Sequence, residues 1–279
     1  MILIVASNSD VASRNIAAKI VDVYNFEECA ETFRSNFTYR KILKRREIRL
    51  VTVEDELPLA QYVTDFFKPD LIVFISRHDS RSGIPTLSVH APGNLGEARF
   101  GGINRRVSVA PANAMRNALL EMFRQRDEMG LSEFDVSYEG THHGPSLDVP
   151  TMFVEVGSSL REWRNPQAAE AVAHGAIAAA VSTSNAVAVL GIGGPHYNRK
   201  FTRLSLESEV AFGHMIPKYA IGGLDLKVLE NCVERTLEAV RYIVLDWKGI
   251  GSKERSGMIE FLKDRHLEVK RTSDLRRGL

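Results

Sequence analysis

Histidines gather in this chain where short apolar stretches give way to polar residues. Six of its eight histidines lie at such places. An imidazole titrates near neutral pH and binds borderline metal ions, so this concentration indicates proton transfer or zinc binding. A single histidine is more often a hydrogen-bonded structural residue, but packing gives six of them no reason to share one kind of location. The six are His78, His90, His142, His143, His196 and His214.

Acidic residues and glycines lie in the same segments and favour activation of water by histidine. In one arrangement His142 or His143 is the general base, and Glu155 orients it or balances its charge. Backbone N–H groups around Gly193 and Gly194 would then bind the oxyanion that forms during hydrolysis.

A second arrangement adds a zinc ion, which acidifies a bound water molecule. We expect the metal to be present because several neutral imidazoles could converge on it. The ligands would come from His78, Asp79, His90, His142 and His196, among which we predict His90, His196 and His78, with His78 also a candidate catalytic residue.

The sequence argues against other nucleophiles. Gly157-Ser158-Ser159 lacks the second glycine of the Gly-x-Ser-x-Gly turn that carries a nucleophilic serine in many hydrolases. Cys29 and Cys232, the only cysteines, fall inside predicted helices and away from strand-end loops. The segment 191–195 lacks the Lys-Ser/Thr pair of a phosphate-binding loop, so we interpret it as a tight turn that aims His196 inward.

The elements that must position these residues alternate between apolar stretches and amphipathic helical patterns. This is typical of an α/β fold with a mixed, mostly parallel sheet and helices on both faces, in which ligands bind beyond the carboxyl ends of the strands. We predict a single domain over residues 1–279, with an elaborated N-terminal part, a basic C-terminal tail and a possible hairpin near Phe134–Val156. Strands are expected at Ile2–Ala6, Ile48–Val53, Leu71–Ile75, Thr86–Val89, Phe134–Tyr138, Thr151–Val156, Ala186–Leu190, Val210–His214 and Tyr242–Leu245; helices are expected at Val11–Val23, Ala112–Met129, Pro166 to about Ser182, Leu224–Val240 and Lys253–His266.

Charge and apolar content exclude several classes of protein. The net charge of +1 argues against a surface coated with basic residues for nucleic acid, although the stretch Arg40–Leu50 and the tail after Lys248 are locally basic. A solvated helix face and a terminal tail are the simpler interpretation of these two segments. The opening Met1–Ala6 is too short for a secretory signal, and no run of 18 apolar residues exists. Together with only two cysteines, these features predict a cytoplasmic protein that does not span a membrane.

Five segments of the chain resemble the archaeal- and plant-type D-aminoacyl-tRNA deacylases. The likeness runs from the first residue to about Trp247, and the combination of Thr-His-His-Gly-Pro with Gly-x-Gly-Gly-Pro-His-Tyr is specific. It implies a fold akin to peptidyl-tRNA hydrolases and nucleoside phosphorylases, dependence on zinc, and hydrolysis of the ester between a D-amino acid and the tRNA ribose. The segments are Ser76-Arg77-His78, His90-x-Pro92-Gly93-Asn94, Glu139–Pro145, Glu155-x-Gly157-Ser158-Ser159 with Trp163, and Gly191–Tyr197 followed by Phe201-Thr202.

With aminoacylated tRNA as substrate, two further groups of residues gain expected roles. Asp79 and Glu139 are candidates to hold the α-ammonium group of the amino acid, and Lys44, Arg45 and Arg46 could bind phosphates of the acceptor arm. We expect a monomer that acts on tRNA and not on DNA. The alternatives are a zinc-dependent amidohydrolase or carboxypeptidase-like enzyme for a small N-acyl amino acid, and a non-catalytic RNA-binding module with structural histidines.

Overall fold

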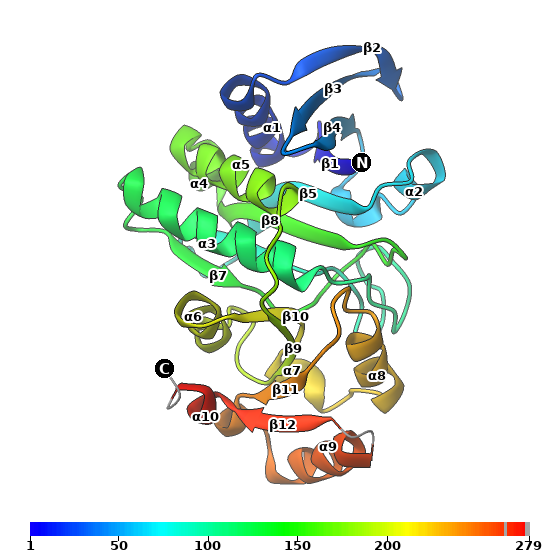
Figure 1. Cartoon of the computed structure of the whole chain (residues 1–279), viewed down its shortest axis with the longest axis vertical. Helices are drawn as coiled ribbons and strands as arrows, with labels where there is room; N and C mark the ends of the chain where they lie inside the picture. The colour runs from blue at the N-terminus through cyan, green and yellow to red at the C-terminus, as the bar shows by residue number, and fades with distance from the viewer. Residues whose placement is uncertain (265–266, 277–279) are drawn as a thin grey trace.

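Strands of the chain form two sheets, one of eight and one of four strands, in a computed structural model that describes residues 1–264 and 267–276 (Figure 1). In spatial order the larger sheet contains β2 (Glu27–Phe33), β3 (Asn36–Leu43), β4 (Arg46–Val53), β1 (Ile2–Ser7), β5 (Leu71–Asp79), β8 (Thr151–Ser158), β6 (Thr86–His90) and β7 (Asp135–Tyr138). The smaller sheet contains β10 (Val210–Ile216), β9 (Val187–Ile192), β11 (Tyr242–Leu245) and β12 (Glu268–Arg271), all parallel.

Strand direction reverses three times across the larger sheet. Its central strands β4, β1, β5 and β8 are parallel, whereas β3 is antiparallel to both β2 and β4. On the other side, β6 runs antiparallel to β8, and β7 runs parallel to β6. The reversal between β8 and β6 places the carboxyl end of β6 beside Phe153 of β8, with the end of β7 next to it, and this junction positions the site.

The two faces of the larger sheet are covered differently. One face packs against α1 (Val11–Tyr24), α3 (Ala112–Glu128) and α5 (Pro166–Ala180), which lie side by side in Figure 1. The opposite face is covered by the short helices η1 (Leu57–Leu59) and α2 (Val63–Phe66) and by loops. All residues of β1 are buried, as expected for a central strand covered on both faces.

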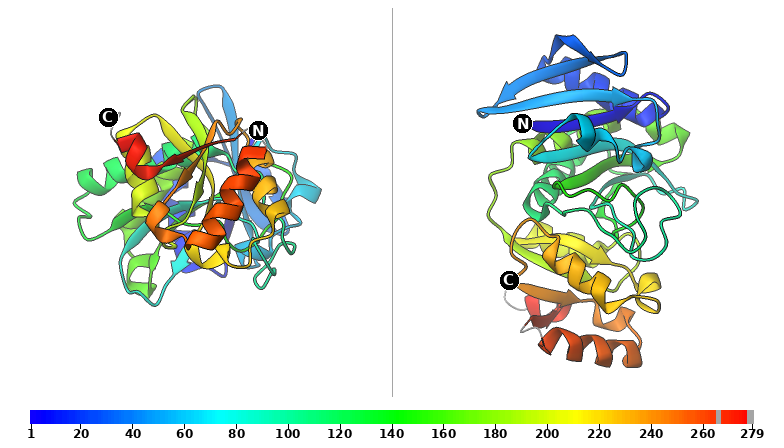
Figure 2. Two further views of the ribbon diagram at one scale, coloured as in Figure 1. Left: turned by 90° about the horizontal axis from the view of Figure 1, so that it is seen from below. Right: turned by 90° about the vertical axis from the view of Figure 1, so that its right-hand side faces the viewer.

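The remaining helices belong mainly to the second sheet. The N-terminal hairpin lies at one end of the long axis and the four-stranded sheet at the other (Figures 1 and 2). A shared apolar core that includes Val189, Phe201 and Phe212 joins the two sheets. These helices are α4 (Leu160–Trp163), which packs on β8, and α6 (Arg199–Glu207), α7 (Lys218–Ile221), α8 (Leu226–Glu234), η2 (Trp247–Gly249), α9 (Ser252–Asp264) and α10 (Thr272–Arg276).

The predicted α/β class with a mostly parallel, mixed sheet is confirmed, and several local predictions are wrong. The strands divide between two sheets, and β7 and β8 form no hairpin because β6 lies between them. Cys29 lies in β2 and not in a helix. The helix predicted at Leu224–Val240 ends at Glu234, because the following Arg235 turns toward the loop carbonyls of Val107 and Leu147.

Two further predictions concern the basic segments and the last predicted helix. The basic stretch Arg40–Leu50 forms strands β3 and β4 and not a helix face. The predicted helix end at His266 and the last basic residue of the tail, Arg277, lie outside the described residues. Within the described residues, no helix combines the length and apolar character that crossing a membrane requires.

Candidate active site

The register of β5 and β8 places three polar side chains together on one face of the sheet. Ser76 pairs with Glu155 in this parallel ladder, and His78 follows Ser76 by two residues, so all three point to the same side. The Ser76 hydroxyl donates a hydrogen bond of 2.5 Å to Glu155 Oε1. His78 Nδ1 lies 3.4 Å from Glu155 Oε2. Ser76 therefore helps to hold the Glu155 carboxylate in place beside His78.

The antiparallel strand β6 contributes His90 to the same face. His90 pairs with Phe153, and its ring stacks on the phenyl ring at a centroid distance of 5.0 Å and an angle of 8°. The imidazole is fully buried, and neither of its nitrogens has a hydrogen-bond partner among the described residues. The closest acid, Glu155, lies 3.7 Å from Nε2. A buried imidazole with two unused nitrogens is costly unless a ligand occupies it.

The loop after β7 carries two more histidines, and contacts with distant segments hold it in place. The backbone N–H of Gly93 donates to the carbonyl of His143 at 2.6 Å. Gly144 leaves no room for a side chain, since a Cβ there would lie 2.3 Å from the carbonyl carbon of Gly101. His143 itself adopts a φ of 39°, which turns the chain so that the rings of His142 and His143 converge with centroids 4.2 Å apart.

Glu139 connects histidines from three different segments. Its carboxylate is fully buried; Oε1 lies 3.1 Å from His78 Nδ1, and Oε2 lies 3.0 Å from His196 Nε2. His142 Nε2 is 3.7 Å from Oε2. Because both oxygens already face imidazoles, this placement argues against the predicted role of Glu139 in holding the α-ammonium group of a substrate.

Five of the six strand-end histidines meet in one cluster with two carboxylates. Ring centroids are 4.3 Å apart for His90 and His142 and 4.6 Å apart for His142 and His196. A cavity of about 570 Å³ opens onto this cluster and is lined by, among others, His78, Asp79, His142, His143, Glu155, His196 and Tyr197. We call the five histidines with Glu139 and Glu155 the histidine cluster.

His214 is the exception among the six. It lies within β10, fully buried, where Nδ1 pairs with the Thr141 hydroxyl at 3.0 Å and Nε2 with the carbonyl of Ser108 at 3.0 Å. Burial lowers its pKa to about 4. His214 is therefore a neutral structural residue that ties β10 to the loops beneath the cluster.

Electrostatics divide the cluster into a charged and a neutral part. Burial alone would lower the pKa of His78, but Glu139 and Glu155 together outweigh it and raise this pKa to about 10. Burial would raise the pKa values of both carboxylates, but the surrounding histidines hold them well below their usual range. His78 is thus a cation between two anions at neutral pH.

His142 and His143 form the neutral part. Burial, reinforced by the neighbouring histidines, lowers the pKa of His142 and lowers that of His143 to about 4. His142 Nδ1 lies 2.8 Å from the carbonyl of Gly140, and His143 Nδ1 lies 2.6 Å from that of Gly144. A carbonyl only accepts, so each Nδ1 carries the hydrogen and each Nε2 keeps a lone pair for a proton or a metal. These carbonyls orient the two rings, whereas Glu155, predicted for this task, contacts Ser76, His78 and His90 instead.

The donor atoms fit a metal ion such as zinc in chemistry and spacing. Three groups have ligand atoms within 4.8 Å of one another: His90 with His142 and His143, Glu139 with His142 and His196, and His78 with Glu139 and Glu155. The unused nitrogens of His90 favour the first group. The predicted ligands His90, His196 and His78 fall into three different groups among the described residues, so they do not form one site together.

The residues predicted to bind substrate are placed differently from one another. Asp79 is exposed at the cavity and forms no ion pair among the described residues, which leaves it available to an ammonium group. The N–H of Gly193 already donates to the carbonyl of Ile216 at 2.8 Å, so its predicted part in an oxyanion site is wrong. Gly194 lines a neighbouring cavity and not that of the histidine cluster.

The basic residues Lys44, Arg45 and Arg46 lie far from the cluster. Lys44 and Arg45 form a two-residue turn between β3 and β4, both with positive φ, at the amino-terminal end of the parallel strands. By register, Arg46 stands nine residues before His78, so the two are roughly 30 Å apart at about 3.3 Å per residue. The Arg46 guanidinium donates to the carbonyl of Ala180 at the end of α5, a structural contact.

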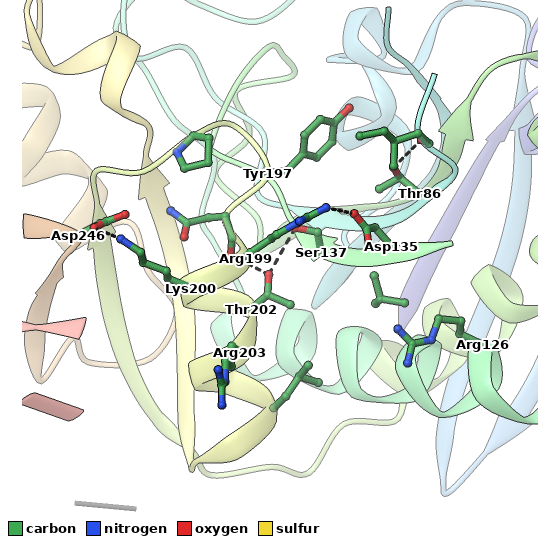
Figure 3. A pocket seen from close by; sticks show the side chains of 15 residues that line it. Thr86, Arg126, Asp135, Ser137, Tyr197, Arg199, Lys200, Thr202, Arg203 and Asp246 are labelled. Atoms are coloured by element: carbon green, nitrogen blue, oxygen red, sulfur yellow. Dashed lines mark hydrogen bonds and ion pairs between the residues drawn. The ribbon is translucent and has the colours of Figure 1, made fainter. Parts of the chain in front are cut away.

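Two other cavities adjoin the cluster through the segment 195–200. The larger, about 720 Å³, has Tyr197 at one end and a row of basic side chains on α6 (Figure 3). Its arginine Arg199 pairs with Asp135 at 2.5 Å, and Lys200 pairs with Asp246 at 2.5 Å. The second, about 670 Å³, includes Pro195, His196 and Tyr219.

Some residues of the site had no role assigned from the sequence. Tyr197 Oη forms a short hydrogen bond with His78 Nε2, and Arg77 pairs with Glu56 at 2.9 Å on the cavity wall. Tyr197 belongs to the segments that carry the resemblance, so a signal existed for it. Phe100, on a loop far away in the sequence, also lines the cavity, and no pattern marks it.

Comparison with known proteins gives one consistent result. A family model described as D-aminoacyl-tRNA deacylase matches residues 65–270. D-aminoacyl-tRNA deacylase of Pyrococcus furiosus is 37% identical over 275 residues, which cover 96% of this chain and 98% of the relative. The proteins of that name from Thermococcus kodakarensis and Methanocaldococcus jannaschii are 38% and 35% identical and cover 91% and 96% of this chain, and 94% and 98% of their own lengths.

A solved structure agrees with this fold. A crystal structure described as a conserved protein of unknown function has a TM-score of 0.88 and 29% identity and covers 99% of this chain and 97% of its own. Futalosine hydrolase of Helicobacter pylori, 12% identical with a TM-score of 0.43 over 64% of this chain, is too distant to carry an argument. The comparisons support the main prediction from the sequence and give no support to the amidohydrolase or carboxypeptidase-like alternative.

Proposed function

The chain belongs to the D-aminoacyl-tRNA deacylase family, and from this premise we propose that it hydrolyses the ester bond between a D-amino acid and the terminal ribose of tRNA. The observation that carries the proposal is the histidine cluster, in which two neutral imidazoles lie beside a cationic imidazole on one cavity. Such a set can take a proton from water and stabilise negative charge without a covalent intermediate.

The proposed reaction uses Nε2 of His142 or His143 as the general base. Water gives its proton to this nitrogen as its oxygen bonds to the ester carbonyl carbon. The bond from that carbon to the ribose oxygen then breaks, and the ribose oxygen takes the proton back from this imidazole as it leaves. Free D-amino acid and tRNA are the products.

His78 and Asp79 have proposed roles in binding. The cationic His78 is held at Nδ1 by Glu139 and Glu155 and at Nε2 by Tyr197 Oη, so its positive charge would act through the Tyr197 hydroxyl, which would donate to the oxygen that becomes negative in the transition state. The exposed carboxylate of Asp79 would pair with the α-ammonium group. Selectivity for the D form would come from the position of this carboxylate relative to the carbonyl, because an L-amino acid could not satisfy both contacts with the same side-chain direction.

A zinc ion remains part of the proposal. His90, His142 and His143 would hold it, and when bound it would supply positive charge that polarises an ester carbonyl or acidifies water. With His142 and His143 as ligands, another member of the cluster would accept the proton. The proposal further includes a cytoplasmic monomer whose nucleic-acid partner is aminoacylated tRNA and not DNA.

Deacylation of D- and L-tyrosyl-tRNA by the purified protein tests the proposal. We expect the D form to be hydrolysed at least tenfold faster, rates to fall after treatment with a chelator, and zinc to restore them. Equal rates for both forms would contradict chiral selection. Full activity after chelation, with metal content measured on the same sample, would contradict the zinc proposal and leave the hydrolase proposal standing.

A further inference from the structure

A cavity on the far side of His196 from the cluster cavity has the chemistry of a nucleotide site. It is bounded by Pro195, His196 and Tyr219 and measures about 670 Å³. His196 lines both cavities: its Nε2 faces Glu139 in the cluster at 3.0 Å, and its Nδ1 lies 3.3 Å from Tyr219 Oη. We call the space beside Tyr219 the Tyr219 cavity; its other lining residues are Gly194, Lys200, Lys218, Asp246 and Lys248.

Tyr219 leaves a large aromatic surface uncovered at this place. Tyr219 is 67% exposed, more than any other exposed aromatic residue in the described part of the chain. Its ring centroid lies 6.2 Å from that of His196, so one edge is held beside the cluster while a face remains open. An open aromatic face next to a polar site is suited to stacking with a nucleobase.

Two of the three lysines of the Tyr219 cavity, Lys218 and Lys248, differ from the cations of its larger neighbour, whereas the third, Lys200, lines both cavities and pairs with Asp246 at 2.5 Å. In the cavity of Figure 3, Arg199 pairs with Asp135, and Arg203 pairs with Glu207 at 2.5 Å. Lys218 and Lys248 are exposed, and no carboxylate of the described residues pairs with either of them. Unpaired lysines beside an open aromatic ring favour an anionic, aromatic ligand.

We propose that the Tyr219 cavity binds the 3′-terminal adenosine of tRNA, with the adenine stacked on Tyr219 and its phosphate between Lys218 and Lys248. This inference rests on the proposed function. The ester joins an amino acid to that adenosine, so the two parts of the substrate would occupy the cavities on either side of His196. The acidic cluster cavity would take the cationic amino acid, and the basic, aromatic cavity would take the nucleotide.

The test measures binding of uncharged tRNA with and without its terminal adenosine. For the natural protein we expect loss of the adenosine to weaken binding roughly five- to hundredfold, the range of one stacked base. Tyr219→Ala should reduce this difference to the part contributed by the terminal phosphate, and Tyr219→Phe should keep most of the difference because the ring remains. Phe37→Ala, at a 59% exposed aromatic residue of β3 outside the three cavities, is the matched control and should keep all of it.

The outcomes separate this inference from the proposed function. An adenosine effect that is absent in the natural protein, or equally large in Tyr219→Ala, overturns the stacking site. The double variant Lys218→Ala/Lys248→Ala should weaken binding of the complete tRNA and should affect the tRNA without its terminal nucleotide much less, because the contacted phosphate is lost with that nucleotide; unchanged affinity for the complete tRNA would overturn the phosphate contacts. Uncharged tRNA needs no turnover, so failure of the natural protein to hydrolyse D-tyrosyl-tRNA would count against the proposed function alone.

Discussion

The histidine cluster and the basic turn between β3 and β4 are both rich in ionisable side chains, yet they differ in what surrounds those side chains. In the cluster, acids and imidazoles are packed within about 3 to 4 Å of one another, and contact determines which of them are charged. In the turn, Lys44 and Arg45 are exposed, and the Arg46 guanidinium donates to the carbonyl of Ala180 at the end of α5. Ionisable residues acquire chemistry through burial and mutual contact, and not through their number in a stretch of sequence.

The difference also follows from where the strands change direction. β6 and β7 run against β8, so residues that end two strands meet residues in the middle of a third. The Lys44–Arg45 turn is a local connection between two sequence neighbours, β3 and β4, at one end of their strands. Only the first arrangement brings together residues from five separate segments, which is what a reaction site with several proton carriers requires.

Removal of the two neutral imidazoles should have the largest effect. We expect His142→Ala/His143→Ala to lower kcat for D-tyrosyl-tRNA by about 10²- to 10⁴-fold, because the proton acceptors and a potential metal group are lost together. Single-turnover deacylation measures the effect, and thermal unfolding checks that the variant is folded. His174→Ala, a histidine on α5 that contacts Tyr24 outside the cluster, is the matched control and should stay within about twofold of the natural protein. Equal losses in both variants would mean that the cluster has no special part in catalysis.

The contrast shows which parts of the molecule can be predicted from sequence. Positions of β1, β5, α1 and α3 follow from local apolar patterns and caps, such as Asp10, whose carboxylate accepts the N–H groups of Ala12 and Ser13. The hairpin of β2 and β3 escapes prediction because its strands are largely exposed and lack an apolar run.

The sequence predicted which histidines belong to the candidate site, but it did not predict what each of them does. Strand-end position identified the five histidines of the cluster, and it also selected His214, which is structural. Long-range contacts distinguish the cluster histidines from His214. The close approach of Gly144 to Gly101 sets the direction of His143, whereas His214 is buried within β10. No periodic pattern or motif in the sequence marks Tyr219. Its exposure depends on the position of α7 beside Pro195 in the folded chain.

His214 provides a second, intermediate effect, on stability and not on turnover. Its pKa in the folded protein is about 4, below the ordinary 6.5, because burial disfavours the cation. As pH falls below 6.5, the unfolded chain binds a proton that the folded protein does not, so the free energy of unfolding falls until about pH 4. The contribution is about 1.4 kcal/mol per pH unit, or roughly 3 kcal/mol in total.

Denaturant unfolding at several pH values between 4 and 8 measures this contribution of His214 to the free energy of unfolding. The cluster histidines titrate too, so the useful quantity is the difference between the natural protein and His214→Gln, which lacks a titrating group. That difference should be constant above pH 7 and shrink toward acid pH. A difference independent of pH would show that burial does not lower the pKa of His214 in the folded protein.

Substitutions in the basic turn should give the smallest effect, and they test whether the turn takes part in tRNA binding. If Lys44, Arg45 and Arg46 contact tRNA phosphates, charge reversal to Glu at all three positions should raise KM by about tenfold or less and leave kcat unchanged, because the residues lie roughly 30 Å from the reacting atoms. The logarithm of affinity should also fall less steeply with the logarithm of salt concentration, by up to about three in slope. An acceptor arm that reaches from the cluster along the edge of the sheet would produce this pattern. Unchanged affinity and an unchanged salt slope would restrict tRNA binding to the side of the molecule that carries the cluster, and would leave Arg46 with its structural contact to α5 alone.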